Sequence, residues 1–261
     1  MTAGQSTANG SEPPKIASRE VRPLARRHYK AVTVTDGKHE GGGFRVLLDG
    51  QALRTPATAV LAVPTRRLAE ALAAEWAAQS ERIDPGTMPL TRLVNSAVDG
   101  IRGREAEVRS EIAKYAESDL LCYRADGPAP LVCRQAKLWD PVLAWGRDEL
   151  GVSLRVAAGV MPMTQPDRAR TALARALAGQ DAFTLAALHA MTTLMGSALL
   201  ALAHARGRLR LEEAWAAAHV DEDWQISQWG EDAEAAARRR HRWLEVAAAS
   251  SLLRLLTTNG C

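Results

Sequence analysis

The stretch Asp181–Ala205, DAFTLAALHAMTTLMGSALLALAHA, is the longest apolar segment of the chain and the best guide to its fold. Its first residue is an aspartate, a good N-cap, and apolar residues occupy almost every position of Leu194–Ala203. A helix that is apolar on all sides is a buried helix. We therefore predict one long helix, Phe183–Ala205, at the centre of a helical domain, with Gly196 and Ser197 allowing a neighbouring helix to approach closely.

Outward from this segment, the chain divides at Asp126–Pro130, DGPAP, the strongest turn-forming break in the sequence. After this break, apolar residues recur mainly at helical spacing. Before it, β-branched residues are concentrated and alternate with polar ones. We predict an α+β fold, in which a small α/β domain (25–125) with antiparallel strands and packed helices precedes an all-α orthogonal helical bundle (130–245).

The two ends of the chain differ in character from these domains. Residues 1–24 are polar and rich in Ser, Gly and Pro, so we expect an N-terminal segment without fixed structure. Residues 246–261 form a leucine-rich C-terminal tail, and the sequence does not indicate where this tail docks.

Four short strands are predicted in the first domain, at 31–35, 44–48, 51–53 and 59–63. A helix follows over 65–79, with Thr65 as its N-cap. Leu68, Leu72 and Trp76 recur at four-residue steps along this helix and define its buried stripe. Trp76 is therefore interpreted as a structural residue that packs the helix on the sheet.

Composition and charge argue against several classes of function. The 261-residue chain has a formal net charge of +3, spread evenly along the sequence, which does not indicate a nucleic-acid partner. Its longest apolar run is about half of a membrane span, so we expect no membrane insertion. Cys122, Cys133 and Cys261 are an odd number of cysteines at no metal-binding spacing, as expected of reduced thiols. Together with the lack of a signal-peptide pattern, these features indicate a bacterial cytoplasm.

Motifs for catalysis or cofactor binding are missing from the sequence. It has no Gly-x-Ser-x-Gly elbow, phosphate loop, dinucleotide fingerprint or His-Glu-x-x-His helix. His189 and His204 lie in the predicted central helix about four turns apart, too far to share one metal ion. We interpret both as hydrogen-bonded core histidines. The sequence therefore predicts no catalytic residue, no metal and no cofactor.

The most unusual stretch is His219–Asp232, HVDEDWQISQWGED, which combines five carboxylates and two tryptophans without any Lys or Arg. In helical form it places Glu222, Gln225, Ile226 and Trp229 on one face. Such a mixture of acid, amide and aromatic ring is typical of a protein-binding surface. The alternative is a tryptophan packed inward with solvated acids around it, and the usual burial of tryptophan favours that alternative when this stretch is taken alone.

Several segments of the chain are distinctive in their order and spacing. They are FRVLLDG (44–50), LRTP (53–56), LAVP (61–64), EWAAQ (75–79), IDP (83–85), MPLT (88–91), SDLLCYR (118–124), GSA (196–198), EA (213–214), DWQ (223–225) and WG (229–230). Together they resemble the assembly chaperones of the F-type ATP synthase head that handle the alpha subunit (the ATP-twelve family). The resemblance covers about residues 27–242.

This resemblance implies a two-domain protein, without enzyme activity of its own, that binds the unassembled alpha subunit and covers the surface later taken by the beta subunit. We expect a cytoplasmic monomer. The candidate client-binding residues that the resemblance and the acidic stretch indicate are Glu222, Asp223, Gln225, Trp229, Glu231 and Asp232. Relatives place an acid and an aromatic residue near Ala233 and Ala235, so contacts beyond these candidates are left open.

Two other functions stay open. A small-molecule enzyme would need converging polar groups in a deep cleft between the domains, such as His189 or His204 beside a carboxylate. A nucleic-acid binder would use the basic cluster Arg238–Arg242, which we interpret instead as a helix C-terminus. A broad acidic and aromatic surface would favour the chaperone.

Overall fold

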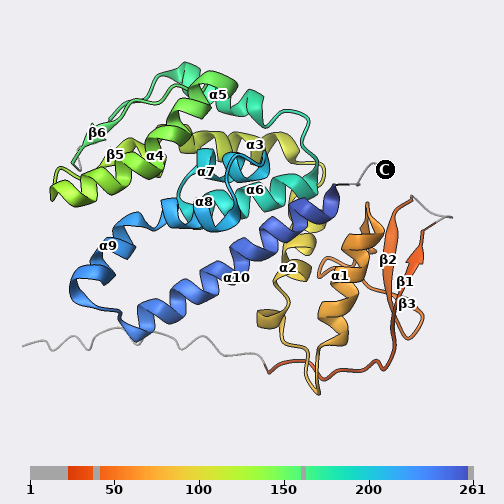
Figure 1. Ribbon diagram of the computed structural model, residues 1–261. Coiled ribbons are helices and arrows are strands. Elements are labelled where there is room, and N and C mark those ends of the chain that lie inside the picture. Colours follow the sequence, from red (N-terminus) through yellow and green to blue (C-terminus); the bar gives the residue numbers. More distant parts are fainter. Residues whose placement is uncertain (1–22, 38–41, 160–162, 258–261) are drawn as a thin grey trace, which may run out of the picture.

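The computed structural model describes residues 23–37, 42–159 and 163–257. The N-terminal segment predicted to lack structure lies outside these residues except for Pro23 and Leu24, and Cys261 lies outside them as well. An antiparallel sheet comes first and a series of helices follows (Figure 1). The predicted α+β class is confirmed.

The sheet is built around β2 (Phe44–Leu48). β1 (Val32–Asp36) pairs with β2 along its whole length, while the short strands β3 (Gln51–Ala52) and β4 (Ala62–Val63) pair with the other edge of β2. All pairings are antiparallel. β-Branched residues suit this half-buried pleated surface, and Val34 lies opposite Val46 in the register. The four predicted strands are confirmed, although the third and fourth are shorter than expected.

α1 (Arg66–Ala77) packs on the sheet with Leu68 and Leu72 fully buried. Thr65 is its N-cap, as predicted: the hydroxyl accepts a hydrogen bond from the Leu68 amide at 3.2 Å. The same hydroxyl donates to the Leu255 carbonyl at 2.7 Å. One side chain thus caps the first helix and ties it to the end of the last.

Trp76 lies half-buried near the end of α1, with its ring centroid 5.8 Å from that of Tyr29. The Tyr29 hydroxyl donates to the Trp76 carbonyl at 2.8 Å. We predict that Trp76→Arg lowers the free energy of unfolding by about 2 kcal/mol or more, because a charge would replace an apolar ring against the core. Trp76→Phe is the control and should cost less. Urea unfolding checks both, and a Trp76→Arg protein as stable as the wild type would show that the ring adds nothing to the packing.

The sheet is joined to the rest of the fold by a run of short elements. These are α2 (Pro89–Ser96), a π-helical turn (Ala97–Ile101), α3 (Glu105–Lys114) and β5 (Tyr123–Arg124), with 3-10 turns at Pro85–Thr87, Tyr115–Glu117 and Leu120–Cys122. Glu75 of α1 positions the first of them, because its carboxylate accepts hydrogen bonds from the Leu90 and Thr91 amides at 2.9 and 2.7 Å. These amides are unpaired donors at the start of α2, and a carboxylate there is favourable.

The remaining chain is mainly helical (Figure 1). Its elements are α4 (Ala129–Leu150), β6 (Ala157–Ala158), α5 (Asp167–Ala176), α6 (Ala182–Met195), α7 (Ala198–Ala205), α8 (Leu211–Ala218), α9 (Val220–Trp229) and α10 (Ala233–Leu256). β6 pairs in parallel with β5, so the two parts of the chain share a small sheet. The DGPAP segment leads directly into α4, and the proposed domain division stays a prediction.

The predicted single helix over 183–205 is wrong, because the chain breaks into α6 and α7 at Gly196 and Ser197. Gly196 has φ +69°, the left-handed conformation that ends many helices. The Ser197 hydroxyl then accepts a hydrogen bond from the Leu200 amide at 3.1 Å and caps α7. The Gly-Ser pair, interpreted from sequence as a site of close approach, is therefore a C-cap followed by an N-cap.

The start of α7 is also capped by Asp119, a fully buried carboxylate from the loop before β5. It accepts hydrogen bonds from the Ala198 amide at 2.9 Å and the Leu121 amide at 3.1 Å. Burial raises the pKa of Asp119 to about 6, and these hydrogen bonds oppose the rise. Two of the distinctive sequence segments, 118–124 and 196–198, thus meet at one buried acid.

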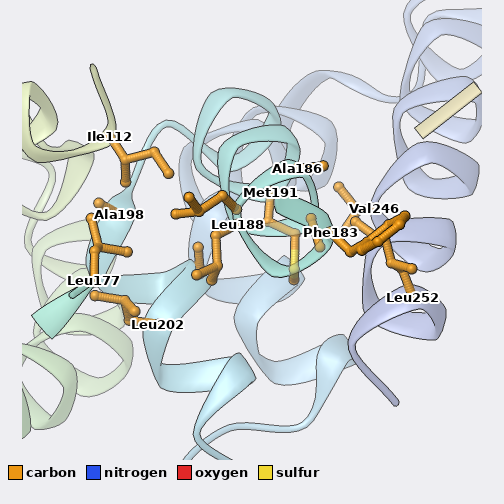
Figure 2. Packing of buried hydrophobic residues seen from close by; sticks show 14 of the residues in the cluster. Ile112, Leu177, Phe183, Ala186, Leu188, Met191, Ala198, Leu202, Val246 and Leu252 are labelled. Carbon is orange, nitrogen blue, oxygen red and sulfur yellow. The ribbon is translucent and has the colours of Figure 1, made fainter. Parts of the chain in front are cut away.

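α6 lies at the centre of the helical part, which confirms that this stretch is buried (Figure 2). Leu188 and Met191 of α6 are almost completely buried. Figure 2 shows them between Ile112 on one side and Val246 and Leu252 of α10 on the other. The core therefore runs continuously from α3 through α6 to the last helix.

The basic cluster Arg238–Arg242 does not lie at a helix C-terminus, as was predicted from the sequence, because α10 continues well beyond it. The cluster lies in the first half of α10, because the alanines that follow continue the helix and Val246, Leu252 and Leu255 are buried. The stretch predicted as a separate tail, 246–261, is helical as far as Leu256. Its last turns pack against the first helices, with Leu255 bonded to Thr65.

Candidate functional site

The acidic stretch forms a helix, α9, that contributes little to the core. Val220 is the one buried residue among the ten of this helix. Burial lowers the pKa of His219, just before α9. Gly230 ends the helix with φ 86° and ψ 175°, a conformation open essentially to glycine alone. Because α9 buries so little apolar surface, polar contacts have to position it.

Two of these contacts join acids of α9 to arginines of α10. Arg239 Nη2 lies 2.5 Å from Asp223 Oδ1, and Arg242 Nη2 lies 3.3 Å from Glu222 Oε2. Two of the four acids that the sequence marks as partner contacts are thus already paired within the chain. Sequence reasoning missed this, because the acidic stretch contains no cation and the arginines come from the next helix.

A third contact joins α9 to α4 through Gln135, which is 1% exposed. Its amide Nε2 donates to Asp221 Oδ1 at 2.7 Å, and its Oε1 accepts from the Ala125 amide at 2.9 Å. A buried amide group with both ends bonded holds the Asp221 carboxylate in a fixed position. Nothing in the sequence marks Gln135, since a glutamine between Arg134 and Lys137 of a long helix is typical of a solvent-exposed position.

The double-mutant cycle of Asp223→Ala and Arg239→Ala is expected to give a coupling free energy of about 0.5 kcal/mol. The pair is partly shielded, with side chains 42% and 20% exposed, so solvent screens it only in part. The matched control is the Glu234–Arg238 pair of α10, whose side chains are 82% and 61% exposed and which should couple more weakly. Urea unfolding of the wild type, the four single variants and the two double variants measures both couplings. Equal coupling free energies for the two pairs would argue that the Asp223–Arg239 pair does not position α9.

The two tryptophans of α9 differ in their surroundings. Trp224 is half-buried, and the Arg134 guanidinium lies 5.0 Å from its ring centroid. Trp229 is 79% exposed at the end of the helix, beside the exposed Gln225. The inward-packed interpretation therefore fits Trp224, whereas Trp229 has the exposed ring expected of a contact residue.

The remaining two candidates lie between α9 and α10. Asp232 Oδ1 accepts a hydrogen bond from the Ala235 amide at 2.7 Å, so this acid caps α10. Glu231 is exposed beside it. The structure therefore spreads the six candidates from the first turn of α9 to the turn that follows this helix, and it gives Glu222, Asp223 and Asp232 intramolecular roles as well.

A groove of about 440 Å³ runs between α9 and the segment that joins β5 to α4. Figure 1 shows α9 beside the start of α4. Trp224, Gln225 and Trp229 form one wall of the groove. The opposite side contains Leu131 and Pro128, so the groove combines apolar surface with polar groups at its edges. These features are typical of a surface that accepts a protein segment.

A second hollow, of about 750 Å³, lies where α2, the π-helical turn, α3 and α6 meet. It contains His189, whose Nε2 is 3.8 Å from Glu111 Oε2, the arrangement that an enzyme would need. Both side chains are about half exposed, at 43% and 54%, and the hollow is open to solvent. His204 instead is half-buried, with its Nε2 2.8 Å from the Ser250 hydroxyl. Among the described residues, no cluster of three or more His, Cys, Asp or Glu could hold a metal ion.

Comparison with known proteins decides the family. The model of the ATP12 chaperone protein family matches residues 26–147. The crystal structure of Atp12 from Paracoccus denitrificans matches with a TM-score of 0.82 at 40% identity, covering 89% of this chain and 99% of that one. This chain belongs to the ATP12 family. A further solved structure from Agrobacterium tumefaciens is 50% identical to this ATP12-family protein, with a TM-score of 0.85 and coverage of 90% and 87%.

Family membership makes the protein a chaperone of ATP synthase assembly and confirms the resemblance found in the sequence. The family match ends at residue 147, whereas the structural match covers 89% of the chain and therefore extends into the helical part beyond that residue. Among the helices of the described residues, none has the length and hydropathy needed to cross a membrane.

Proposed function

We propose that this ATP12-family chaperone binds the unassembled alpha subunit of the F-type ATP synthase and covers its intersubunit surface until the beta subunit replaces it. The observation that carries the proposal is the 79% exposure of Trp229 at the rim of the α9 groove. An aromatic ring so far in solvent gains most when a partner buries it. We propose further that the chaperone acts as a monomer in the bacterial cytoplasm and has no catalytic activity.

The proposed contact surface is the exposed end of α9 and the turn that follows it. Gln225 and Trp229 would contact the client directly, with Glu231 at the rim. Glu222, Asp223 and Asp232 would contribute from the edge and also hold α9 and α10 in place. One aromatic anchor in a small groove suits a chaperone, because the complex has to come apart when the beta subunit arrives.

Refolding of the client tests the proposal. Purified alpha subunit is diluted from denaturant in the presence of the chaperone, and light scattering and gel filtration follow the mixture. We expect suppressed aggregation and a stoichiometric complex, because an orphan subunit exposes the apolar surface meant for its neighbour. The beta subunit, treated in the same way, is the control. Aggregation of alpha that proceeds unchanged beside the folded chaperone would overturn the proposal.

A further inference from the structure

The groove beside α9 contains carboxylates that no cation of the groove neutralises. Asp126 and Asp221 both line it. Asp221 Oδ1 is bonded to Gln135, and in the described part of the chain no hydrogen bond or ion pair engages its Oδ2. Arg124 is the cation that lines the groove, but its Nη2 bonds to Asp140 at 2.6 Å and its guanidinium lies 5.0 Å from the Trp139 ring centroid. The groove is therefore acidic.

The aromatic wall of the groove suits a cation as well. The Arg134 guanidinium already lies over one of its rings, that of Trp224, at 5.0 Å from the centroid. The neighbouring ring, that of Trp229, is 79% exposed. Tryptophan is the aromatic side chain that attracts cations most strongly. An acid held in place and an exposed indole thus line the same groove.

We infer that this groove receives an arginine or lysine side chain of the client protein. The cation would lie against Asp221 and the exposed ring of Trp229, while its aliphatic stem would cover Leu131 and Pro128. Charge complementarity selects this occupant over an apolar side chain. The inference rests on the proposed function and deepens it, since it names the chemistry of the client segment. It also separates Asp221 from Glu222 and Asp223, whose cations come from α10.

A pair of short peptides tests the groove independently of the client. The probes are acetyl-Leu-Arg-Leu-amide and the same peptide with citrulline, which has nearly the shape of arginine but no charge. The indole N–H signals of Trp224 and Trp229 are followed by NMR in the full-length chaperone. We expect the arginine peptide to shift both signals, and the shift to diminish at high salt. Equal shifts with citrulline would indicate an apolar occupant, and no shift with either peptide would also overturn the inference.

Affinity for the alpha subunit provides the second test, with Asp221→Asn as the variant. The amide keeps an oxygen acceptor for Gln135 and removes only the charge. We expect binding about tenfold weaker and less dependent on salt, whereas Glu149→Gln, at an exposed acid of α4 outside the groove lining and the proposed contact surface, should change neither. Suppose that the wild type binds alpha and that the Asp221→Asn variant binds it with the same affinity and the same salt dependence. This result would refute the cation site, while the proposed client would stand. A wild-type chaperone that ignores alpha but binds the arginine peptide selectively would refute the client and keep the site.

Discussion

Replacing Trp229 by alanine is expected to weaken binding of the alpha subunit by at least about 2 kcal/mol, a loss of roughly thirtyfold. The side chain is 79% exposed, so the folded chaperone hardly uses it and a bound client can bury it. The melting temperature should therefore stay close to that of the wild type. Biolayer interferometry against freshly refolded alpha subunit measures the affinity, and thermal unfolding checks the fold.

Leu244→Ala is the matched control for this experiment. Leu244 is also an exposed apolar residue, at 56%, but it lies on α10 outside the α9 groove. Its removal should leave the affinity within a factor of about two, since single exposed apolar residues are common on ordinary surfaces. If both variants lost affinity equally, the contact surface would extend along α10. An unchanged affinity in folded Trp229→Ala would remove this residue from the contact surface.

The second large effect is expected in stability, from Asp119→Ala. The substitution leaves the buried amides of Leu121 and Ala198 without their acceptor, at about 1–3 kcal/mol each, and removes the cap of α7. We expect the free energy of unfolding to fall by about 3 kcal/mol. Asp181→Ala is the control, because Asp181 caps α6 from an exposed position and should cost only about 1 kcal/mol. Equal losses for the two variants in urea unfolding would contradict this account.

The raised pKa of Asp119 also predicts how the free energy of unfolding depends on pH. Its pKa is raised from 3.8 to about 6 in the folded protein, so between these values the folded state binds more protons than the unfolded state. The stability that this group contributes therefore falls as pH rises from about 4 to 6, by roughly 3 kcal/mol over two pH units. Asp119→Asn lacks this titration. As pH rises from about 4 to 6, the free energy of unfolding of the wild type should therefore fall relative to that of Asp119→Asn. Urea unfolding at several pH values measures this difference, and a difference that does not change with pH would contradict the raised pKa.

The local patterns of the sequence were sufficient to predict the class of fold and many of its elements. Thr65 followed by the stripe containing Leu68 and Leu72 predicted α1 and its cap, because both signals lie within one helix. The predicted long helix failed at Gly196 and Ser197, since the same two residues suit either close packing or a pair of caps. Periodicity alone does not separate these two cases.

Long-range contacts account for what the sequence could not predict at the site. The acids of α9 looked free because the arginines that pair with them, Arg239 and Arg242, lie in a different helix. Gln135 gave no signal, although it fixes Asp221 from α4. The ring of Trp229 was predicted on a mixed polar face, but helical spacing alone could not show that it is 79% exposed at the end of the helix. Each of these facts depends on how helices meet.

A photocrosslinking experiment tests the central claim most directly. A photoreactive phenylalanine derivative replaces Trp229 in one variant and Leu244 in another, and each is irradiated with equal amounts of freshly refolded alpha and beta subunits. We predict that position 229 crosslinks to alpha, on the surface that beta covers in the assembled head, and that position 244 does not. A complex with alpha that forms without any crosslink from position 229, or a crosslink to beta alone, would contradict the claim.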